Sequence, residues 1–484
     1  MSENPRIPDT NDHFIDGRAY PPAGGERFQS VNPADGQPLG EFARGTAEDV
    51  DAAVRSAEQG FESWRALKPF QRGQCLYGIA QALRERAEEF AYFETLDSGK
   101  PLRASRNDIE ASARYFEYYA GAADKILGET IPATNDHLVY TVLEPFGVTA
   151  HVLPWNSPMS QLCRGAAPAL AAGNSIVVKP AEQTPYTALL FAELCVQAGL
   201  PAGAYNVVIG LGHEAGEALV RHEGVRRITF TGSVETGQRV MHAGADRVVP
   251  VTTELGGKSP ILVFADADLD KAATSCVNAF VGNSGQSCSA GSRILIERSI
   301  YADMLERMVQ IIRNDITYGP GLENHRIGPL ISESQLERVL SFIKSGVSEG
   351  ARLVCGGRRA GGALANGYFV EPTLFADVGG SMRIFQEEIF GPVGSAAAFE
   401  GEEEAVRLAN ATQYGLVAGI WTQDVSRAHR LSRRLEGGQV FINSYREVNI
   451  EVPFGGYKYS GIGREKGLEA LKHYVQHKAV VVRT

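Results

Sequence analysis

A cysteine among small residues is the first candidate for chemistry in this sequence. Cys288 stands in NSGQSCSAGSR (residues 283–293), where Gly285, Ser287 and Ser289 would let a substrate approach the sulfur. A nearby backbone N–H or helix terminus would lower the thiol pKa and favour the nucleophilic thiolate. The alternative is a small residue packed in a tight turn. The chain has six cysteines, and each is by default a buried, inert thiol.

Two polar side chains at the ends of predicted strands could assist such a nucleophile. Glu254 ends VVPVTTEL and precedes a flexible pair, Gly256 and Gly257, so its carboxylate could act as a general base. Asn156, in LPWNSP, could donate its amide to an oxyanion, with the backbone N–H of Cys288 as second donor. The ordinary alternatives are a solvated glutamate at a loop start and an asparagine that caps a helix.

Two further segments could bind a nucleotide. The chain lacks a G-x-G-x-x-G after an early strand, so the usual Rossmann fingerprint is absent. Instead, ITFTGSVETG places Gly232 and Ser233 between a strand and a helix, where free N–H groups could bind pyrophosphate. Lys179 and Glu182, in VVKPAEQTP, follow another strand and could bind an adenosine ribose. Glu182 would repel a 2′-phosphate, which favours NAD, with NADP as the alternative.

Alternating strand and helix patterns must position these residues. Residues 1–45 predict strands and turns, and helical patterns follow in residues 47–67 and from 70 to about 96. Between residues 147 and 254, short β-branched runs alternate with helical stretches, as in βαβ units with a parallel sheet. Ligands of such sheets bind at the carboxyl ends of the strands. A second α/β region runs from residue 260 to about 454.

The last segment, HYVQHKAVVVRT, predicts a lone strand. A single strand needs a partner edge, so we expect it to pair with another subunit. The strand-like residues 136–142 are its natural companion.

Composition limits the class of protein. The 484 residues allow two or three domains, and 44% hydrophobic with 21% charged residues is typical of a globular protein. A net charge of −10 argues against binding nucleic acid or an anionic membrane. No apolar run approaches the roughly 18 residues of a spanning helix, and MSENPRIPDTNDHF lacks the features of a secretory signal. Without zinc spacing, the cysteines predict no metal site and a reducing, cytoplasmic location.

Together the motifs resemble those of the aldehyde dehydrogenase superfamily, in the family's order and over essentially the whole chain. They are PWN at 154, KPAEQTP at 179, FTGS at 230, ELGGKSP at 254, GQSC at 285, EEIFGPV at 387 and PFGGYKYSGIGRE at 453. The resemblance implies an α/β fold with two Rossmann-like domains and a small β oligomerisation element, in a homodimer or homotetramer. The implied parts are an NAD-binding domain (1–126 and 146–256), a catalytic domain (257–466) and the oligomerisation element (127–145 and 467–484).

The resemblance also implies a role for individual residues. Cys288 matches the nucleophile, Glu254 the general base, Asn156 the oxyanion donor and Glu465 a second glutamate that relays protons from the base. The implied cofactor contacts are Pro154, Trp155, Lys179, Glu182, Gly232, Ser233, Leu255, Glu388 and Phe390. The implied reaction is NAD-dependent oxidation of an aldehyde to a carboxylic acid. It passes through a Cys288 thioester, which water activated by Glu254 hydrolyses.

Departures from the family pattern bear on the substrate. Arg164 stands at a position that faces the substrate tunnel, and it resembles the arginine that holds a carboxylate in succinate-semialdehyde-type enzymes. Gly282 stands where those enzymes often have a second arginine, which Arg446 at the tunnel mouth could replace. Phe454 is an implied substrate contact, and Gly165 stands where a basic residue is usual.

These residues predict a polar or carboxylate-bearing aldehyde as substrate. The alternative is that each arginine forms an ordinary salt bridge and does not bind the substrate. The protein would then be a general aliphatic or aromatic aldehyde dehydrogenase. A coenzyme-A-acylating enzyme is a further alternative, against which Glu254 argues because such enzymes usually lack the hydrolytic base.

Overall fold

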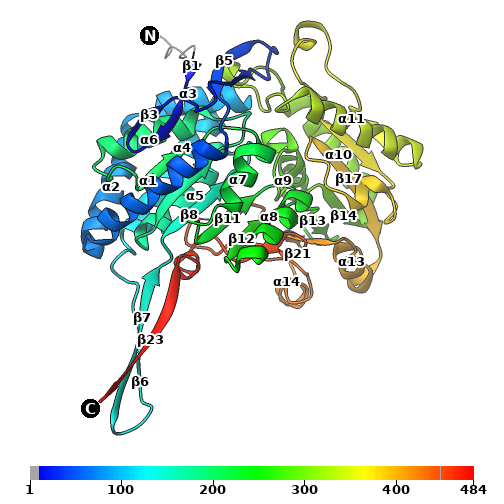
Figure 1. Ribbon diagram of the computed structural model, residues 1–484. Helices are drawn as coiled ribbons and strands as arrows, with labels where there is room; N and C mark the ends of the chain where they lie inside the picture. The colour runs from blue at the N-terminus through cyan, green and yellow to red at the C-terminus, as the bar shows by residue number, and fades with distance from the viewer. Residues whose placement is uncertain (1–9, 447–448) are drawn as a thin grey trace.

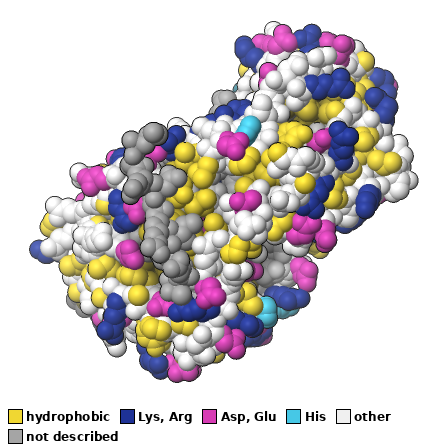
Figure 2. All heavy atoms as spheres, turned by 90° about the horizontal axis from the view of Figure 1, so that it is seen from above, with side chains coloured by type: hydrophobic (Ala, Val, Ile, Leu, Met, Phe, Trp, Pro, Cys, Tyr) yellow, Lys and Arg dark blue, Asp and Glu magenta, His cyan; other side chains and the backbone are white. Residues whose placement is uncertain are grey.

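Two large β-sheets organise the chain, and a small third sheet projects from the body of the molecule (Figure 1). The computed structural model describes residues 10–446 and 449–484. The α/β fold class expected from the alternating patterns is confirmed. No helix among the described residues is long and apolar enough to cross a membrane. On the face seen in Figure 2, acidic and basic side chains are interspersed.

The first large sheet has the order β22-β12-β11-β8-β9-β10-β2-β3. Its central strands β10, β9, β8, β11 and β12 are parallel, as predicted, and β2 and β22 join antiparallel at the two sides. The strands are β2 (His13–Ile15), β3 (Arg18–Tyr20), β8 (Val148–Val152), β9 (Ser175–Lys179), β10 (Tyr205–Val207), β11 (Arg227–Thr231), β12 (Val251–Glu254) and β22 (Gly461–Ile462). The side chains of β8 and β9 are buried along almost the whole of both strands, which fits a sheet that is covered on both faces.

Helices cover both faces of this sheet. One face carries α1 (Ala47–Arg65), η1 (Gly212–Gly216), α7 (Glu217–Arg221) and α8 (Val234–Arg247). The other carries α2 (Pro69–Glu85), α3 (Ala87–Ser98), α4 (Leu102–Ala120), α5 (Pro158–Ala171) and α6 (Tyr186–Gln197). The pattern in residues 70–96 is two helices, because the backbone leaves the helical region at Arg86 (ψ 17°). The α4 helix has no counterpart among the sequence predictions.

The second large sheet has the order β15-β16-β17-β14-β13-β19-β20 and is parallel except for β15. Its strands are β13 (Pro260–Val263), β14 (Arg293–Glu297), β15 (Arg352–Cys355), β16 (Thr373–Ala376), β17 (Val393–Phe399), β19 (Val417–Trp421) and β20 (Gln439–Ile442). One face packs against α9 (Leu269–Val281) and α10 (Tyr301–Asp315). The other packs against α11 (Glu333–Ser348), α12 (Arg383–Gln386), α13 (Gly401–Ala409) and α14 (Val425–Ser432).

The remaining elements are short. They are β1 (Thr10–Asn11), β4 (Arg27–Val31), β5 (Pro38–Ala43), η2 (Gly282–Gly285), η3 (Arg298–Ile300), η4 (Gly321–Glu323), η5 (Gly362–Leu364), β18 (Tyr414–Gly415), β21 (Tyr457–Lys458) and α15 (Glu469–Lys472). The strands β1, β5 and β4 form a sheet of their own, and β18 pairs with β21.

The projecting sheet contains the last strand of the chain. It consists of β6 (Thr130–Ile131), β7 (His137–Pro145) and β23 (Val475–Arg483). The pairing of residues 136–142 with the last strand is confirmed within one chain: β23 pairs with β7 from Val475↔Pro145 to Arg483↔His137. Because β23 is the edge strand of this sheet, its pairing with another subunit stays a prediction. Both strands leave the body at its lower left in Figure 1.

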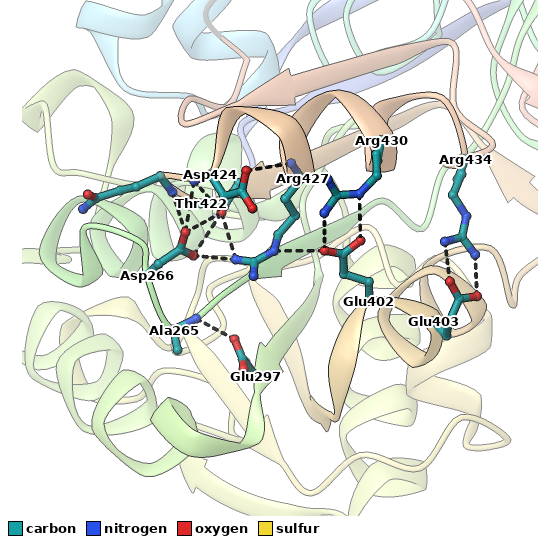
Figure 3. A network of polar contacts seen from close by, with 11 residues as sticks. Ala265, Asp266, Glu297, Glu402, Glu403, Thr422, Asp424, Arg427, Arg430 and Arg434 are labelled. Carbon is teal, nitrogen blue, oxygen red and sulfur yellow. Dashed lines mark hydrogen bonds and ion pairs between the residues drawn. The ribbon is translucent and has the colours of Figure 1, made fainter.

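A surface network ties the second sheet to its helices (Figure 3). Asp266, just after β13, accepts hydrogen bonds from the Thr422 hydroxyl, from the backbone N–H groups of Gln423 and Asp424, and from Arg427. Arg427 also reaches Glu402 on α13, so one arginine joins the loop after β13 to α13 and α14.

Replacing Asp266 with alanine should lower the thermal unfolding midpoint at pH 7 by about 1–3 °C, because two backbone donors and Arg427 lose their acceptor. Burial alone would raise the pKa of Asp266, but the Thr422 hydroxyl and Arg427 lower it overall. Such a carboxyl stabilises the fold above its unfolded pKa of about 3.9 and loses that effect below it. The difference from wild type, followed by scanning fluorimetry, should therefore shrink below about pH 4. If the variant and the wild type differed equally in unfolding midpoint at pH 7 and below pH 4, this explanation would be wrong. Asp246→Ala is the control variant.

Candidate active site

A cavity of about 310 Å³ lies where β8, β11 and β12 end, at the crevice expected from the parallel sheet. It brings together most of the residues predicted to do chemistry or bind a cofactor. These are Pro154, Trp155, Asn156, Gly232, Ser233, Glu254, Leu255, Cys288, Glu388 and Phe390. The predicted residues Lys179, Glu182, Arg164, Arg446, Phe454 and Glu465 do not line it.

The Cys288 loop is held by tight backbone packing. It lies between α9 and β14, so it leads into a strand. Asn283 and Ser284 have positive φ (53° and 56°), which turns the chain sharply before the cysteine. Gly285 also has a positive φ (72°), and a Cβ there would lie 2.0 Å from the carbonyl oxygen of Gly391. Glycine is therefore required at this position by both conformation and space.

The environment of the Cys288 thiol corrects one prediction. Burial raises its pKa to about 11, although Arg164 acts in the opposite direction. The expected lowering by a helix terminus does not occur, because α9 ends before the loop and no helix begins at the cysteine. The sulfur is therefore a protonated thiol at neutral pH, and it needs a base to become a nucleophile.

Gly256 and Gly257 are required by close contacts rather than for flexibility. A Cβ on Gly256 would lie 2.3 Å from Oε2 of Glu388, and one on Gly257 would lie 2.2 Å from the carbonyl oxygen of Cys288. The Gly257 N–H also donates to Oε1 of Glu388 at 3.0 Å. This glycine pair thus lets the segment after Glu254 touch both the cysteine loop and Glu388.

Glu254 is the last residue of β12, as predicted, and it is 1% exposed. Neither of its carboxyl oxygens has a hydrogen-bond partner among the described residues. Burial, and then the neighbouring Glu465, raise the pKa of Glu254 well above the usual carboxyl range. The solvated glutamate considered as an alternative is therefore excluded, and the side chain is a buried, desolvated carboxyl.

Asn156 is not a helix cap, because Ser157 occupies the cap position of α5. Its Nδ2 donates to the carbonyl oxygen of Gln286 at 3.1 Å. The Nδ2 of Asn283 donates in return to the carbonyl oxygen of Asn156 at 2.8 Å. These bonds hold Asn156 against the cysteine loop, while its side chain still lines the cavity beside Cys288.

Glu388 and Phe390 form the opposite wall. Burial raises the pKa of Glu388 to about 7. Phe390 has a positive φ (59°) and meets the Trp155 ring edge-on, with ring centres 5.2 Å apart. Sequence reasoning missed Gln335 and Arg338, which also line the cavity. They stand one turn apart on α11 and donate to the carbonyl oxygens of Phe390 (2.8 Å) and Glu388 (2.9 Å). In the sequence, these two residues look like any polar residues on a helix surface, so no pattern indicates their place at the cavity.

The predicted nucleotide contacts lie at two strand ends. Ser233 caps α8, where its Oγ accepts the N–H of Thr236 at 3.2 Å. Lys179, the last residue of β9, pairs with Glu182 at 3.0 Å (Nζ to Oε2). This pair lies outside the cavity that Cys288 lines.

Arg164 forms an ion pair within the protein, which was the alternative to binding a substrate carboxylate. Its Nε pairs with Oε2 of Glu465, and its guanidinium carbon lies 5.2 Å from the centre of the Phe454 ring. Residue 164 is 6% exposed. Arg446, by contrast, is exposed and has a positive φ (63°). Its Nη1 would lie 3.6 Å from a Cβ on Gly282, so it occupies the space beside that glycine.

The chain matches known proteins along nearly its whole length. The model of the aldehyde dehydrogenase family matches residues 20–480. The chain belongs to the aldehyde dehydrogenase family. DhaS of Bacillus subtilis (strain 168), named as an aldehyde dehydrogenase, is 44% identical over 473 residues, which cover 97% of this chain and 95% of DhaS. The resemblance seen in the motifs is thereby confirmed, and the protein is an aldehyde dehydrogenase.

Solved structures of aldehyde dehydrogenases have the same fold. The NAD⁺ complex of an aldehyde dehydrogenase from Bacillus cereus is 42% identical, with a TM-score of 0.97, and the match covers 99% of this chain and 97% of that one. A Burkholderia cenocepacia protein, also named as an aldehyde dehydrogenase, is 49% identical with a TM-score of 0.95, over 98% of this chain and 99% of that one.

In this aldehyde dehydrogenase, the His151 side chain occupies the space beside Gly165. A Cβ at position 165 would lie 2.8 Å from Nδ1 of His151, so the histidine takes the room that a larger residue would need. Burial, assisted by Arg227, lowers the pKa of His151 to about 3, so its ring is neutral. The usual basic residue is thus absent from position 165, and His151 does not replace its charge. Among the described residues, no group of His, Cys, Asp and Glu side chains is placed to hold a metal ion.

Proposed function

We propose that this enzyme oxidises an aldehyde to a carboxylic acid with NAD, through a hemithioacetal and then a thioester on Cys288. The observation that carries the proposal is that Cys288, Asn156 and Glu254 line a single cavity. Oxidation of an aldehyde through a thioester requires a nucleophile, a donor to the oxyanion and a base within one cavity. The decisive experiment is a screen for NADH formation over a broad aldehyde panel with both NAD and NADP. No turnover with any aldehyde would overturn the proposal.

The residues of this chain divide the reaction into two steps. The Cys288 thiol gives its proton to the Glu254 carboxylate, which passes it on through Glu465. The sulfur adds to the aldehyde carbon, and the Asn156 amide with the Cys288 backbone N–H stabilises the oxyanion. Bound NAD would supply the acceptor for the hydride that leaves this adduct. Glu254 then takes a proton from water, and the resulting hydroxide adds to the thioester carbonyl. The carbon–sulfur bond breaks, the acid departs, and the Cys288 sulfur is free again. Glu465 relays the proton away from Glu254.

The cofactor is NAD, and the residues present fit it. At the cavity wall the buried Glu388 carboxyl group accepts a hydrogen bond from the Gly257 N–H, and Gly256, which has no Cβ, leaves room for it. A carboxyl group in this position suits the two hydroxyls of a ribose. The start of α8 at Ser233 offers backbone N–H groups to a pyrophosphate. Lys179 and Glu182 would hold the adenosine ribose. The Bacillus cereus relative with 42% identity binds NAD⁺.

Replacing Glu182 with glutamine should move the cofactor preference toward NADP. The Glu182 carboxylate, whose pKa is lowered by Lys179 although burial opposes this, is an anion that repels a 2′-phosphate. We expect the ratio of kcat/KM for NAD over NADP to fall by about tenfold, which corresponds to one charge interaction of about 1.4 kcal/mol. The measurement is initial rates with both cofactors. An unchanged ratio would exclude Glu182 as the discriminating residue, and Glu193→Gln on α6 is the control.

We further propose that the substrate bears a carboxylate or a strongly polar group, held by Arg446. Arg164 is engaged with Glu465, so it is not free to grip a substrate. Arg446 is exposed, lies beside Gly282 and acts electrostatically on Cys288. An exposed arginine in this position can bind a carboxylate through two hydrogen bonds.

Replacing Arg446 with alanine should lower kcat/KM for semialdehyde acids by about 10–100-fold, because one charge-assisted contact is lost. For alkyl aldehydes of matched length the value should stay within about twofold. The measurement is the ratio of the two kcat/KM values in wild type and variant. Equal losses for both substrate types would favour a general aldehyde dehydrogenase. Arg298→Ala, an exposed residue paired with Glu400, is the control.

A coenzyme-A-acylating reaction is the remaining alternative. Glu254 argues against it, since a base at the thioester favours water as the acyl acceptor. Adding coenzyme A and analysing the products by mass spectrometry separates the two: the hydrolytic enzyme yields free acid with or without it.

The assembly and location of the enzyme are also proposals. The projecting sheet carries exposed apolar residues, Leu138, Val481 and Val482, which suits an oligomerisation element in a homodimer or homotetramer. The division into an NAD-binding domain (1–126 and 146–256), a catalytic domain (257–466) and this element (127–145 and 467–484) is proposed on the same grounds. The six cysteines are free, in keeping with a reducing cytoplasm. Light scattering after size exclusion would give the number of subunits.

A further inference from the structure

A buried ion pair lies behind the segment that carries Asn156. Glu94 on α3 is 0% exposed, and its Oε1 accepts a hydrogen bond from Nζ of Lys100 at 2.9 Å. The same Nζ reaches Oδ2 of Asp108 on α4 at 2.6 Å. None of these three side chains lines the described cavity around Cys288. Because desolvation opposes the attraction in a buried ion pair, stability alone is a weak reason for such a pair.

Glu94 also caps the helix that follows Asn156. Its Oε2 accepts the backbone N–H of Met159 at 3.2 Å. The α5 helix begins at Pro158, which has no N–H, so Met159 carries the first backbone donor of the helix. The Ser157 side chain, at the cap position, accepts no N–H of the described first turn. Glu94 therefore supplies, from α3, the acceptor that fixes the start of α5, and Asn156 lies two residues before that start.

The turn after α3 reaches the loop on the other side of the cavity. Gly99 in this turn has a positive φ (74°), and a Cβ on Gly328 would lie 2.0 Å from its carbonyl oxygen. Gly328 is also attached to the cysteine loop, because its own carbonyl oxygen accepts the Ser284 hydroxyl at 2.7 Å. Lys100 directly follows Gly99, so its bond to Glu94 holds the turn against this segment.

These contacts close a ring around the oxyanion site. Asn156 donates to the carbonyl oxygen of Gln286, two residues before Cys288. The Gln286 side chain accepts, through Oε1, the N–H of Ile331 at 2.9 Å, in the same segment as Gly328. The two loops thus meet at Gln286, and each is attached by a separate route to the buried ion pair. The distance between the two oxyanion donors therefore depends on that pair.

We propose that Glu94 is a positioning residue for the oxyanion site. Through the start of α5 and the turn at Lys100, it sets the place of the Asn156 amide relative to the backbone N–H of residue 288. The inference rests on the proposed role of Asn156 as an oxyanion donor. Both donors must point at one oxygen, and a misplacement of about 1 Å in such a site can cost about 10²-fold in rate. Glu94 acts as a hydrogen-bond acceptor, so an uncharged acceptor can replace it.

The test is a double-mutant cycle between Glu94 and Asn156, measured as kcat/KM for a neutral alkyl aldehyde. Glu94→Leu is similar in size and removes the acceptor, so kcat/KM should fall about 10–100-fold. Asn156→Ala should itself cost about 10²–10³-fold. In that background Glu94→Leu should cost less than about threefold more, because the amide that it positions is gone. Rates are expressed per NAD-binding site, counted by fluorescence titration, so that unfolded enzyme does not contribute.

Two further variants serve as controls. Glu94→Gln keeps an oxygen that accepts the Met159 N–H, and Lys100 keeps Asp108 as its partner, so kcat/KM should stay within about threefold of wild type. Glu88→Leu lies on the same helix and removes an exposed ion pair, so kcat/KM should stay within about twofold.

The outcomes separate positioning from a general structural role. Losses that multiply in the double variant would overturn the proposal, as would a Glu94→Leu enzyme within about twofold of wild type. If Glu94→Leu does not fold, Ser284→Ala decides. It removes the link to Gly328 and should lower kcat/KM about three- to tenfold in the wild type but not in Asn156→Ala. An unchanged value in the wild type would overturn the proposal.

Failure of the proposed function appears separately in the same experiment. A wild-type rate in Asn156→Ala alone would show that Asn156 is not the oxyanion donor. Absent turnover in the wild type would show that the proposed oxidation itself is wrong.

Discussion

The Cys288→Ala enzyme should form NADH at least about 10⁴-fold more slowly than wild type, because no other group in the cavity can form the covalent adduct. NAD should still bind. The loop is held by backbone contacts that alanine preserves, namely the approach of Gly257 to the carbonyl oxygen of residue 288 and the turn at Gly285. The measurements are absorbance at 340 nm with an active aldehyde and a titration of NAD by fluorescence quenching.

A matched control comes from the other half-buried cysteines. Cys355 on β15 is also partly exposed but does not line the cavity, so Cys355→Ala should leave kcat within about twofold. NADH formation by Cys288→Ala at the wild-type rate would remove Cys288 as the nucleophile.

Glu254→Gln should separate the two halves of the reaction. The glutamine amide cannot take a proton from water, so the thioester forms and then persists. We expect one rapid burst of NADH per active site, followed by a steady rate about 10²–10³-fold below wild type. The steric change is small, and the buried site has no hydrogen bonds to Glu254 that the substitution would break among the described residues.

Trapping the intermediate completes this experiment. The intact mass of the variant after the burst should increase by one acyl group, and hydroxylamine, which cleaves thioesters, should restore turnover. Glu436→Gln, at an exposed glutamate, is the control. A steady rate equal to wild type, with no accumulated acyl-enzyme, would show that another group activates the water.

Much of the fold could be predicted because its signals are local. Short β-branched runs separated by helical stretches predict parallel strands, and the chemical residues stand directly after those runs, at Asn156, Glu254 and Ser233. Strand ends in a parallel sheet converge, so the meeting of these residues follows from their places in the sequence. The same reasoning explains why Gln335 and Arg338 were missed, since they come from a helix surface.

The failures concern properties set by distant contacts. The thiol pKa of Cys288 depends on burial by the segments around Gly257 and Gly391, which are far away in sequence. The partner of Arg164 is about three hundred residues downstream, and helix periodicity carries no information about it.

The position of β22 has a consequence for the order in which the enzyme is made. This strand completes the first sheet beside Glu254, yet it is translated about two hundred residues after that glutamate. At about 5–20 residues per second, a ribosome needs at least about ten seconds to reach it. Throughout that interval the nascent sheet lacks its last strand, and Glu254 lacks its neighbour Glu465. The edge at β12 is then an open template for wrong pairing, so a chaperone that shields nascent strands would protect this edge in particular.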